Sequence, residues 1–98
     1  MPKYLIERNI SGAGNLTPRE LYDISCKSNA VLAELAPRVQ WQQSYVTEDK
    51  IYCVYIADDA DAVLEHARLG GFPADSVTPV SKVIDPSTGE LAAAVDSR

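Results

Sequence analysis

The chain has 98 residues, of which 9 are Lys or Arg and 14 are Asp or Glu, and its net charge is −5. This length fits one domain, and a hydrophobic content of 46% is ordinary for a globular protein. Because phosphate binding needs a basic face, the acidic balance argues against nucleic acid as the default partner.

Alternation near the N-terminus predicts a first strand over residues 3–9. Successive side chains of a strand point to opposite faces, so one face carries Tyr4, Ile6 and Arg8, and the other carries Leu5 and Glu7. A stretch rich in Gly, Ser and Asn over residues 10–16 indicates a loop.

A first helix is predicted to begin after Thr17, because Pro18 suits the first helical position and Glu20 completes a capping box. The helix should end before Pro37. Helical spacing gives it one buried face, made of Leu21, Ile24, Ser25, Ser28, Val31, Leu32 and Leu35.

Residues 39–47 and 50–57 are predicted to pair as an antiparallel hairpin. A second helix should begin at the acidic residues 58–61 and end at Gly70 and Gly71, with a buried stripe of Ala60, Val63, Leu64 and Ala67. The last strand is predicted over residues 76–84, at a sheet edge or with a bulge, because Pro79 cannot donate to a ladder.

The order β-α-β-β-α-β predicts an α+β, ferredoxin-like fold over residues 1–86, a four-stranded antiparallel sheet with both helices on one face. A tail over residues 87–98 is expected to be mobile or to dock on a partner subunit. The helices are expected to cover Ile6, Val54 and Ile56. The other face should carry Leu5, Glu7, Trp41, Gln43, Tyr45, Cys53 and Tyr55.

Such an apolar face is unfavourable in water, so we expect a homodimer or a higher homo-oligomer that packs sheet to sheet. The chain start lacks the apolar stretch of a secretory signal, and the longest uncharged apolar run, residues 51–57, is too short to span a membrane. We therefore expect a cytoplasmic protein, not bound to membranes, in which Cys26 and Cys53 stay reduced.

Candidate metal ligands are few. His66 is the only histidine, and the positions three and four residues before it on the predicted helix hold no second ligand, while Glu65 points elsewhere around the helix. The alternative role for His66 is that of a cation near the helix C-terminus. Cys53 is either a thiolate ligand or a small buried hydrophobic side chain.

Four further residues suit a cavity between two sheets. Glu7 could act there as a general base or a ligand, or it could form a salt bridge. Trp41, Tyr45 and Tyr55 are either interface residues or rings that stack on a small-molecule ligand. No established catalytic motif is present in the sequence, so no residue is assigned a catalytic role.

Five segments carry a family resemblance: Tyr4–Arg8, Val31–Leu35, Trp41–Thr47, Asp49–Tyr55 and Glu65–Pro73. Together they resemble a family of small bacterial proteins of unassigned function, whose described representative is an actinobacterial nickel-responsive, nickel-binding protein. The resemblance covers roughly residues 3–86. It implies a ferredoxin-like subunit that self-associates and binds Ni²⁺, without fixing the ligands.

Three hypotheses follow from the residues and the resemblance, of which the third is a purely structural association domain. The first is a self-associating protein that binds a divalent metal such as Ni²⁺, with His66, Glu65 and Cys53 as candidate ligands. The second is a dimeric α+β barrel enzyme or small-molecule binder of the monooxygenase or isomerase type, with Glu7 as acid/base and an aromatic cavity.

Overall fold

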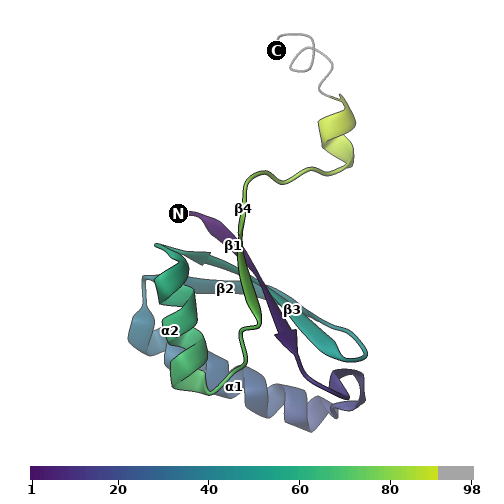
Figure 1. Cartoon of the computed structure of the whole chain (residues 1–98), viewed down its shortest axis with the longest axis vertical. Helices are drawn as coiled ribbons and strands as arrows, with labels where there is room; N and C mark the ends of the chain where they lie inside the picture. Colours follow the sequence, from purple (N-terminus) through teal and green to yellow (C-terminus); the bar gives the residue numbers. More distant parts are fainter. Residues whose placement is uncertain (91–98) are drawn as a thin grey trace.

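The computed structural model describes residues 1–90 (Figure 1). Its elements follow the predicted order: β1 (Lys3–Asn9), α1 (Pro18–Leu35), β2 (Val39–Val46), β3 (Lys50–Ala57), α2 (Ala60–Gly70) and β4 (Ser76–Val80), with short 3-10 turns at Ala13–Asn15 and Pro86–Glu90. All strand pairs are antiparallel, in the order β2-β3-β1-β4. This confirms the ferredoxin-like α+β fold with β1 and β3 central.

Both helices begin at side-chain caps that satisfy free backbone amides. At α1, the Thr17 hydroxyl accepts from the Glu20 amide and the Glu20 carboxylate accepts from the Thr17 amide, which confirms the capping box. At α2, Asp59 accepts from the Ala62 amide. The α2 helix is capped at its C-terminus by Gly71, whose φ of 69° is the left-handed conformation that glycine adopts without strain.

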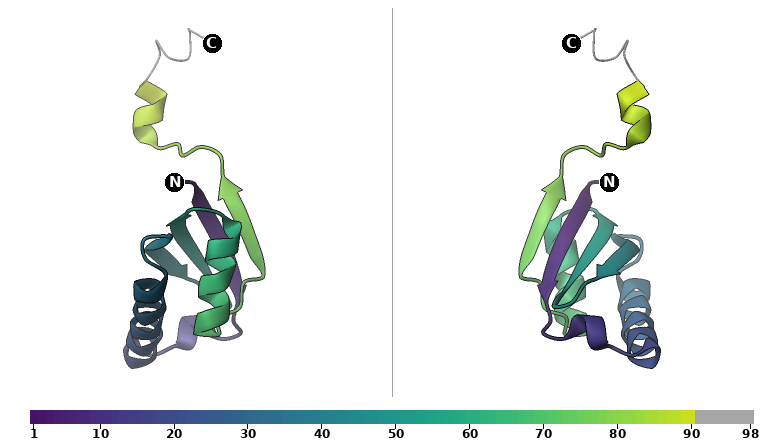
Figure 2. Two further views of the ribbon diagram at one scale, coloured as in Figure 1. Left: turned by 90° about the vertical axis from the view of Figure 1, so that its left-hand side faces the viewer. Right: turned by 90° about the vertical axis from the view of Figure 1, so that its right-hand side faces the viewer.

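Both helices lie on one side of the sheet: in the two opposite views of Figure 2, α2 stands in front of the strands in one and behind them in the other. The strand β4 is an edge strand, as predicted, and Pro79 pairs opposite Tyr4. It ends at Val80 rather than at residue 84, and the chain then runs away from the sheet with Val83 and Ile84 exposed (Figure 1). Residues 91–98 of the predicted tail lie outside the described residues.

The prediction of which β3 side chains face the helices is wrong. Ile6 pairs opposite Cys53, and Tyr4 pairs opposite Tyr55, so Cys53 and Tyr55 lie under the helices. Leu5 pairs opposite Val54, and Lys3 opposite Ile56; Val54 and Ile56 therefore lie on the uncovered face, which we call the open face. The helix-covered face of β3 consists of Ile51, Cys53, Tyr55 and Ala57, all buried.

A β-bulge in β2 accounts for a second correction. The register shifts between Trp41 and Gln43, so that Trp41 pairs opposite Tyr55 while Gln43 pairs opposite Val54. The extra residue reverses the alternation. Trp41 consequently lies on the helix-covered face, and Gln43 and Tyr45 lie on the open face, so the three do not share a face as predicted.

Helix α2 is turned relative to the predicted stripe. Val63 and Ala67 are buried as expected, but Leu64 is 45% exposed. Ala62 and His66 occupy the buried face instead.

In the part of the chain that the structure describes, no helix combines the length and apolar content needed to cross a membrane.

Candidate functional site

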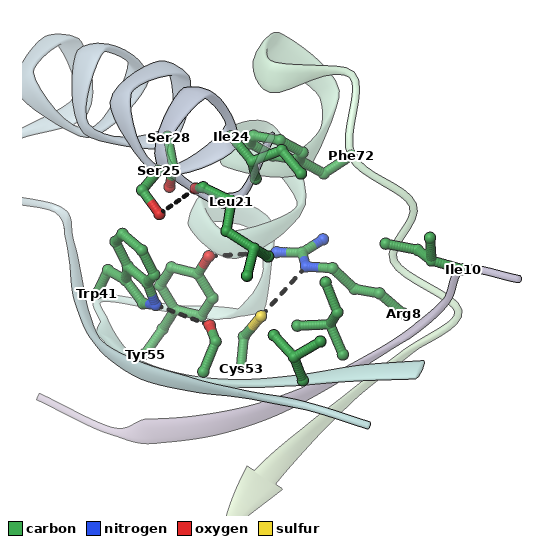
Figure 3. Close-up of a pocket in the computed structure, with 13 residues that line it drawn as sticks. Arg8, Ile10, Leu21, Ile24, Ser25, Ser28, Trp41, Cys53, Tyr55 and Phe72 are labelled. Atoms are coloured by element: carbon green, nitrogen blue, oxygen red, sulfur yellow. Dashed lines mark hydrogen bonds between the residues drawn. The ribbon is translucent and has the colours of Figure 1, made fainter. Parts of the chain in front are cut away.

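A partly enclosed pocket of about 110 Å³ lies between the helix-covered face of the sheet, α1 and the segment after α2 (Figure 3). Most of the side chains around it are apolar, and a few carry polar groups. The lining residues are Arg8, Ile10, Leu21, Ile24, Ser25, Ser28, Trp41, Ser44, Val46, Ile51, Cys53, Tyr55 and Phe72.

Arg8 is the central polar residue of this pocket. It extends from β1 on the same face as Tyr4 and Ile6, and it is only 4% exposed. Its Nε donates to Cys53 Sγ at 3.4 Å, and one terminal nitrogen donates to Tyr55 Oη at 3.3 Å. The other terminal nitrogen donates to the carbonyl oxygen of Pro73.

No carboxylate pairs with Arg8 among residues 1–90, and no Asp or Glu belongs to the pocket lining. The guanidinium carbon instead lies 5.6 Å from the ring centre of Phe72 and 6.0 Å from that of Tyr55. Such aromatic contacts stabilise a cation in part. The pocket therefore contains a buried positive charge that neutral groups alone surround.

His66 lies just behind the pocket and is completely buried. Its Nε2 is 3.0 Å from Ser28 Oγ, while Nδ1 has no partner in the described structure. Burial lowers the pKa of His66, and the charge of Arg8 lowers it further, to about 4. The hydrogen bond with Ser28 acts in the opposite direction but is weaker than these two effects. The imidazole is therefore neutral at pH 7.

Two other side chains are fixed at the pocket wall. Burial raises the pKa of Tyr55, with a smaller contribution from Cys53, while Arg8 acts in the opposite direction. The phenol consequently stays protonated at neutral pH. The indole of Trp41 donates to Ser44 Oγ at 2.9 Å, which ties the ring across the β2 bulge.

The residues chosen from the sequence are divided between two sites. Trp41, Tyr55 and Cys53 line the pocket, whereas Glu7 and Tyr45 lie on the open face. Glu7 forms a salt bridge with Lys50 and raises the pKa of that lysine, which matches the salt-bridge alternative. A cavity between two sheets cannot combine Glu7 with all three aromatic residues as expected, because Trp41 and Tyr55 lie on the opposite face.

The three candidate metal ligands are also separated. Glu65 lies on the outer side of α2 and pairs with Arg68 at 2.5 Å, which lowers the pKa of Glu65. Over residues 1–90, no group of three or more His, Cys, Asp or Glu side chains is placed to hold a metal ion. The free Nδ1 of His66 is a potential donor, but it is closed off from solvent and lies near a fixed cation. The surroundings of His66 and Cys53 therefore do not fit a divalent metal.

The sequence reasoning missed Arg8, Phe72 and the pairing of Ser28 with His66. A signal for Arg8 was present, because strand alternation places it on the same face as Ile6. Ser28 likewise lies on the predicted buried face of the first helix. Phe72 follows the C-terminal glycines of α2, and no local pattern predicts how it folds back over the pocket.

Comparison with known proteins adds the family. The model of the family described as nickel responsive protein SCO4226-like matches residues 4–80, which is most of the chain. The chain belongs to this family. No curated protein matches it at a significant level.

A solved structure agrees with the fold. The crystal structure of SCO4226 from Streptomyces coelicolor A3(2) superposes with a TM-score of 0.71 at 20% identity, and the match covers 84% of this chain and 99% of the other. At this identity the likeness shows the shared fold. It supports the ferredoxin-like arrangement of this SCO4226-like chain and leaves its ligand to be argued from its own residues.

Proposed function

We propose that this SCO4226-like chain is a cytoplasmic, nickel-responsive protein that binds Ni²⁺ at its surface and self-associates through the open face. The observation that carries the proposal is the family match over residues 4–80. The carboxylates of Asp61 and Glu65 on α2 and the apolar residues of the open face support it.

The proposed metal position is on the outer side of α2. Glu65 and Asp61 are one helical turn apart, at the spacing of neighbouring side chains, and a bound metal would replace Arg68 as the partner of the Glu65 carboxylate. Ni²⁺ accepts carboxylate ligands, but two carboxylates do not complete its coordination shell. Water, or ligands from a second copy of the chain, would supply the remaining positions, which links metal binding to association.

The open face supports the proposal that a second copy covers it. Its apolar residues include Leu5, which is 39% exposed, and Tyr45, which is 54% exposed, together with half-buried Val54 and Ile56. Its carboxylate Glu7 is neutralised by Lys50 within the same chain. Two chains of net charge −5 can therefore meet at this face with little local repulsion.

Titration calorimetry with NiCl₂ on tag-free protein tests the metal site. We expect binding at a fixed ratio per chain, weakened at least about tenfold by Glu65→Gln. Glu34→Gln is the matched control, since Glu34 is exposed on α1. The variants His66→Gln and Cys53→Ser should keep the affinity of the wild type. Absence of binding by folded protein would refute the proposed function, and loss of binding in His66→Gln alone would refute the surface position.

The barrel-enzyme alternative loses its main premise. Glu7, its proposed acid/base, lies on the open face as predicted but is paired with Lys50, and Trp41 and Tyr55, which were to line the same cavity, lie on the opposite face of the sheet. Small-molecule binding remains supported by the pocket itself, through a different residue.

A further inference from the structure

We infer that the pocket around Arg8 binds a small aliphatic monocarboxylate, with its carboxylate against the guanidinium and its hydrocarbon chain against the apolar wall. This site is separate from the open face and from the outer side of α2. It does not depend on nickel binding, and the two proposals can fail independently.

The charge of Arg8 is the first step of the argument. A guanidinium remains protonated in proteins, and removing an unpaired cation from water is unfavourable. Here the Cys53 thiol sulfur, the Pro73 carbonyl and the Tyr55 phenol each accept one hydrogen bond, so N–H groups remain on the two terminal nitrogens. A carboxylate has the charge and the planar geometry that match such a guanidinium.

The neighbouring groups favour an anion over a cation. Tyr55 stays protonated, and its hydroxyl lies beside the terminal nitrogen of Arg8. His66 is neutral and is separated from the pocket by Ser28. The described pocket lining therefore supplies a positive charge and hydroxyl donors, with no competing carboxylate.

The dimensions and the apolar wall define the rest of the ligand. The volume of about 110 Å³ is several times the roughly 30 Å³ that one water occupies in the liquid, and it is below the about 150 Å³ cavity known to admit benzene. Leu21, Ile24, Val46 and Ile51 are among the apolar residues of the lining. A short hydrocarbon chain fits this space, whereas sulfate or phosphate would leave the apolar wall uncovered.

The test uses butyrate and its neutral analogue butyramide on metal-free, full-length protein. Trp41 is the only tryptophan and lines the pocket, so its fluorescence reports occupancy directly. We expect saturable binding of one butyrate per chain and at least about tenfold weaker binding of butyramide, because the amide lacks the charge that pairs with Arg8. Sodium phosphate at the same ionic strength should not compete.

Variants locate the ligand within the pocket. Arg8→Met should abolish butyrate binding, and Ser25→Leu should weaken it at least about tenfold by filling the space. Asn29→Leu is the matched control, because Asn29 is exposed on the same helix and lies outside the lining. The comparison of Ser25→Leu with Asn29→Leu decides the question even where Arg8→Met does not fold.

Three results would overturn the inference. They are equal affinity for butyrate and butyramide, unchanged affinity in folded Ser25→Leu, and displacement of butyrate by phosphate at the same ionic strength. The first would show an apolar site without charge recognition, the second a site elsewhere, and the third a general anion site. Any of them would leave the nickel titration unaffected.

Discussion

Ser28 of α1 and His66 of α2 meet through a hydrogen bond of 3.0 Å between Oγ and Nε2 in the buried layer between the helices and the sheet. Both side chains are buried, so this is a polar contact between two helices away from solvent. The ring of His66 also lies 5.2 Å from that of Tyr55 and 5.6 Å from that of Phe72, measured between centroids. The imidazole is therefore held by a hydroxyl on one side and by aromatic rings on the others.

Acidification should destabilise the protein through His66. The pKa of about 4 in the folded state is below the ordinary value of 6.5, so the unfolded chain binds the proton more readily. The free energy of unfolding is therefore unaffected by protonation of His66 above pH 6.5. It falls by roughly 2–4 kcal/mol in total as the pH decreases from 6.5 towards 4. Urea unfolding of chelator-treated protein at several pH values measures this loss.

His66→Gln is the control for that experiment, because a glutamine amide does not titrate. Its stability should depend less on pH between 6.5 and 4.5 than that of the wild type, since only the shared carboxylates then contribute. Parallel curves for the two proteins would show that His66 is not the group responsible.

Removal of the Ser28 hydroxyl should also lower the stability of the folded protein. In Ser28→Ala, both ring nitrogens of the buried His66 would lack a protein partner, and we expect a loss of about 1–3 kcal/mol in the free energy of unfolding. Ser25→Ala is the comparison, because the Ser25 hydroxyl donates to the Leu21 carbonyl within its own helix. Equal losses for the two variants in urea unfolding would contradict the role assigned to Ser28.

Local sequence signals predicted the elements of this fold but not the faces of its sheet. The capping box at Thr17 and the bounds of β1 and β3 follow from short-range chemistry. The strand β3 is different, because it has apolar residues on both faces and hence no polar side to identify the exterior. Only pairing with β1, which places Cys53 opposite Ile6, fixes its orientation.

The site was harder to predict than the fold, because it depends on contacts between distant segments. Arg8 and Pro73 are 65 residues apart in the sequence, and Ser28 and His66 are 38 apart. A charged residue in a strand is ordinarily assigned to the exterior, and the bulge that turns Trp41 inward has no marker in the sequence. The pocket was therefore out of reach of periodicity alone.

Gly70→Ala should disturb the pocket through Phe72. A Cβ at this position would overlap the Phe72 ring, with Cδ2 only 2.6 Å away, so the ring would have to leave its place beside Arg8 and His66. We expect a loss of about 1–3 kcal/mol in unfolding free energy. Gly89→Ala is the control, since a Cβ there meets nothing within 4 Å. Equal stability of the two variants would contradict this packing.

A charge on the open face should prevent self-association. Leu5→Lys places a cation at the centre of the proposed sheet-to-sheet contact, and sedimentation velocity should then show a monomer where the wild type shows a dimer or larger species. Leu64→Lys is the matched control, because Leu64 is similarly exposed, at 45%, on α2. A wild type that sediments as a monomer at micromolar concentration with Ni²⁺ present would refute the interface.

The two cysteines should differ in their reaction with a thiol reagent. Cys26 is exposed on α1, whereas Cys53 is 4% exposed and accepts a hydrogen bond from Arg8 Nε. Because a buried thiol reacts only when the structure opens, Cys26→Ser should react with dithionitrobenzoate at least about tenfold more slowly than Cys53→Ser in native buffer. In denaturant the two variants should react at the same rate. A fast native reaction of Cys26→Ser would show that Cys53 is open to solvent and that the pocket wall is placed incorrectly.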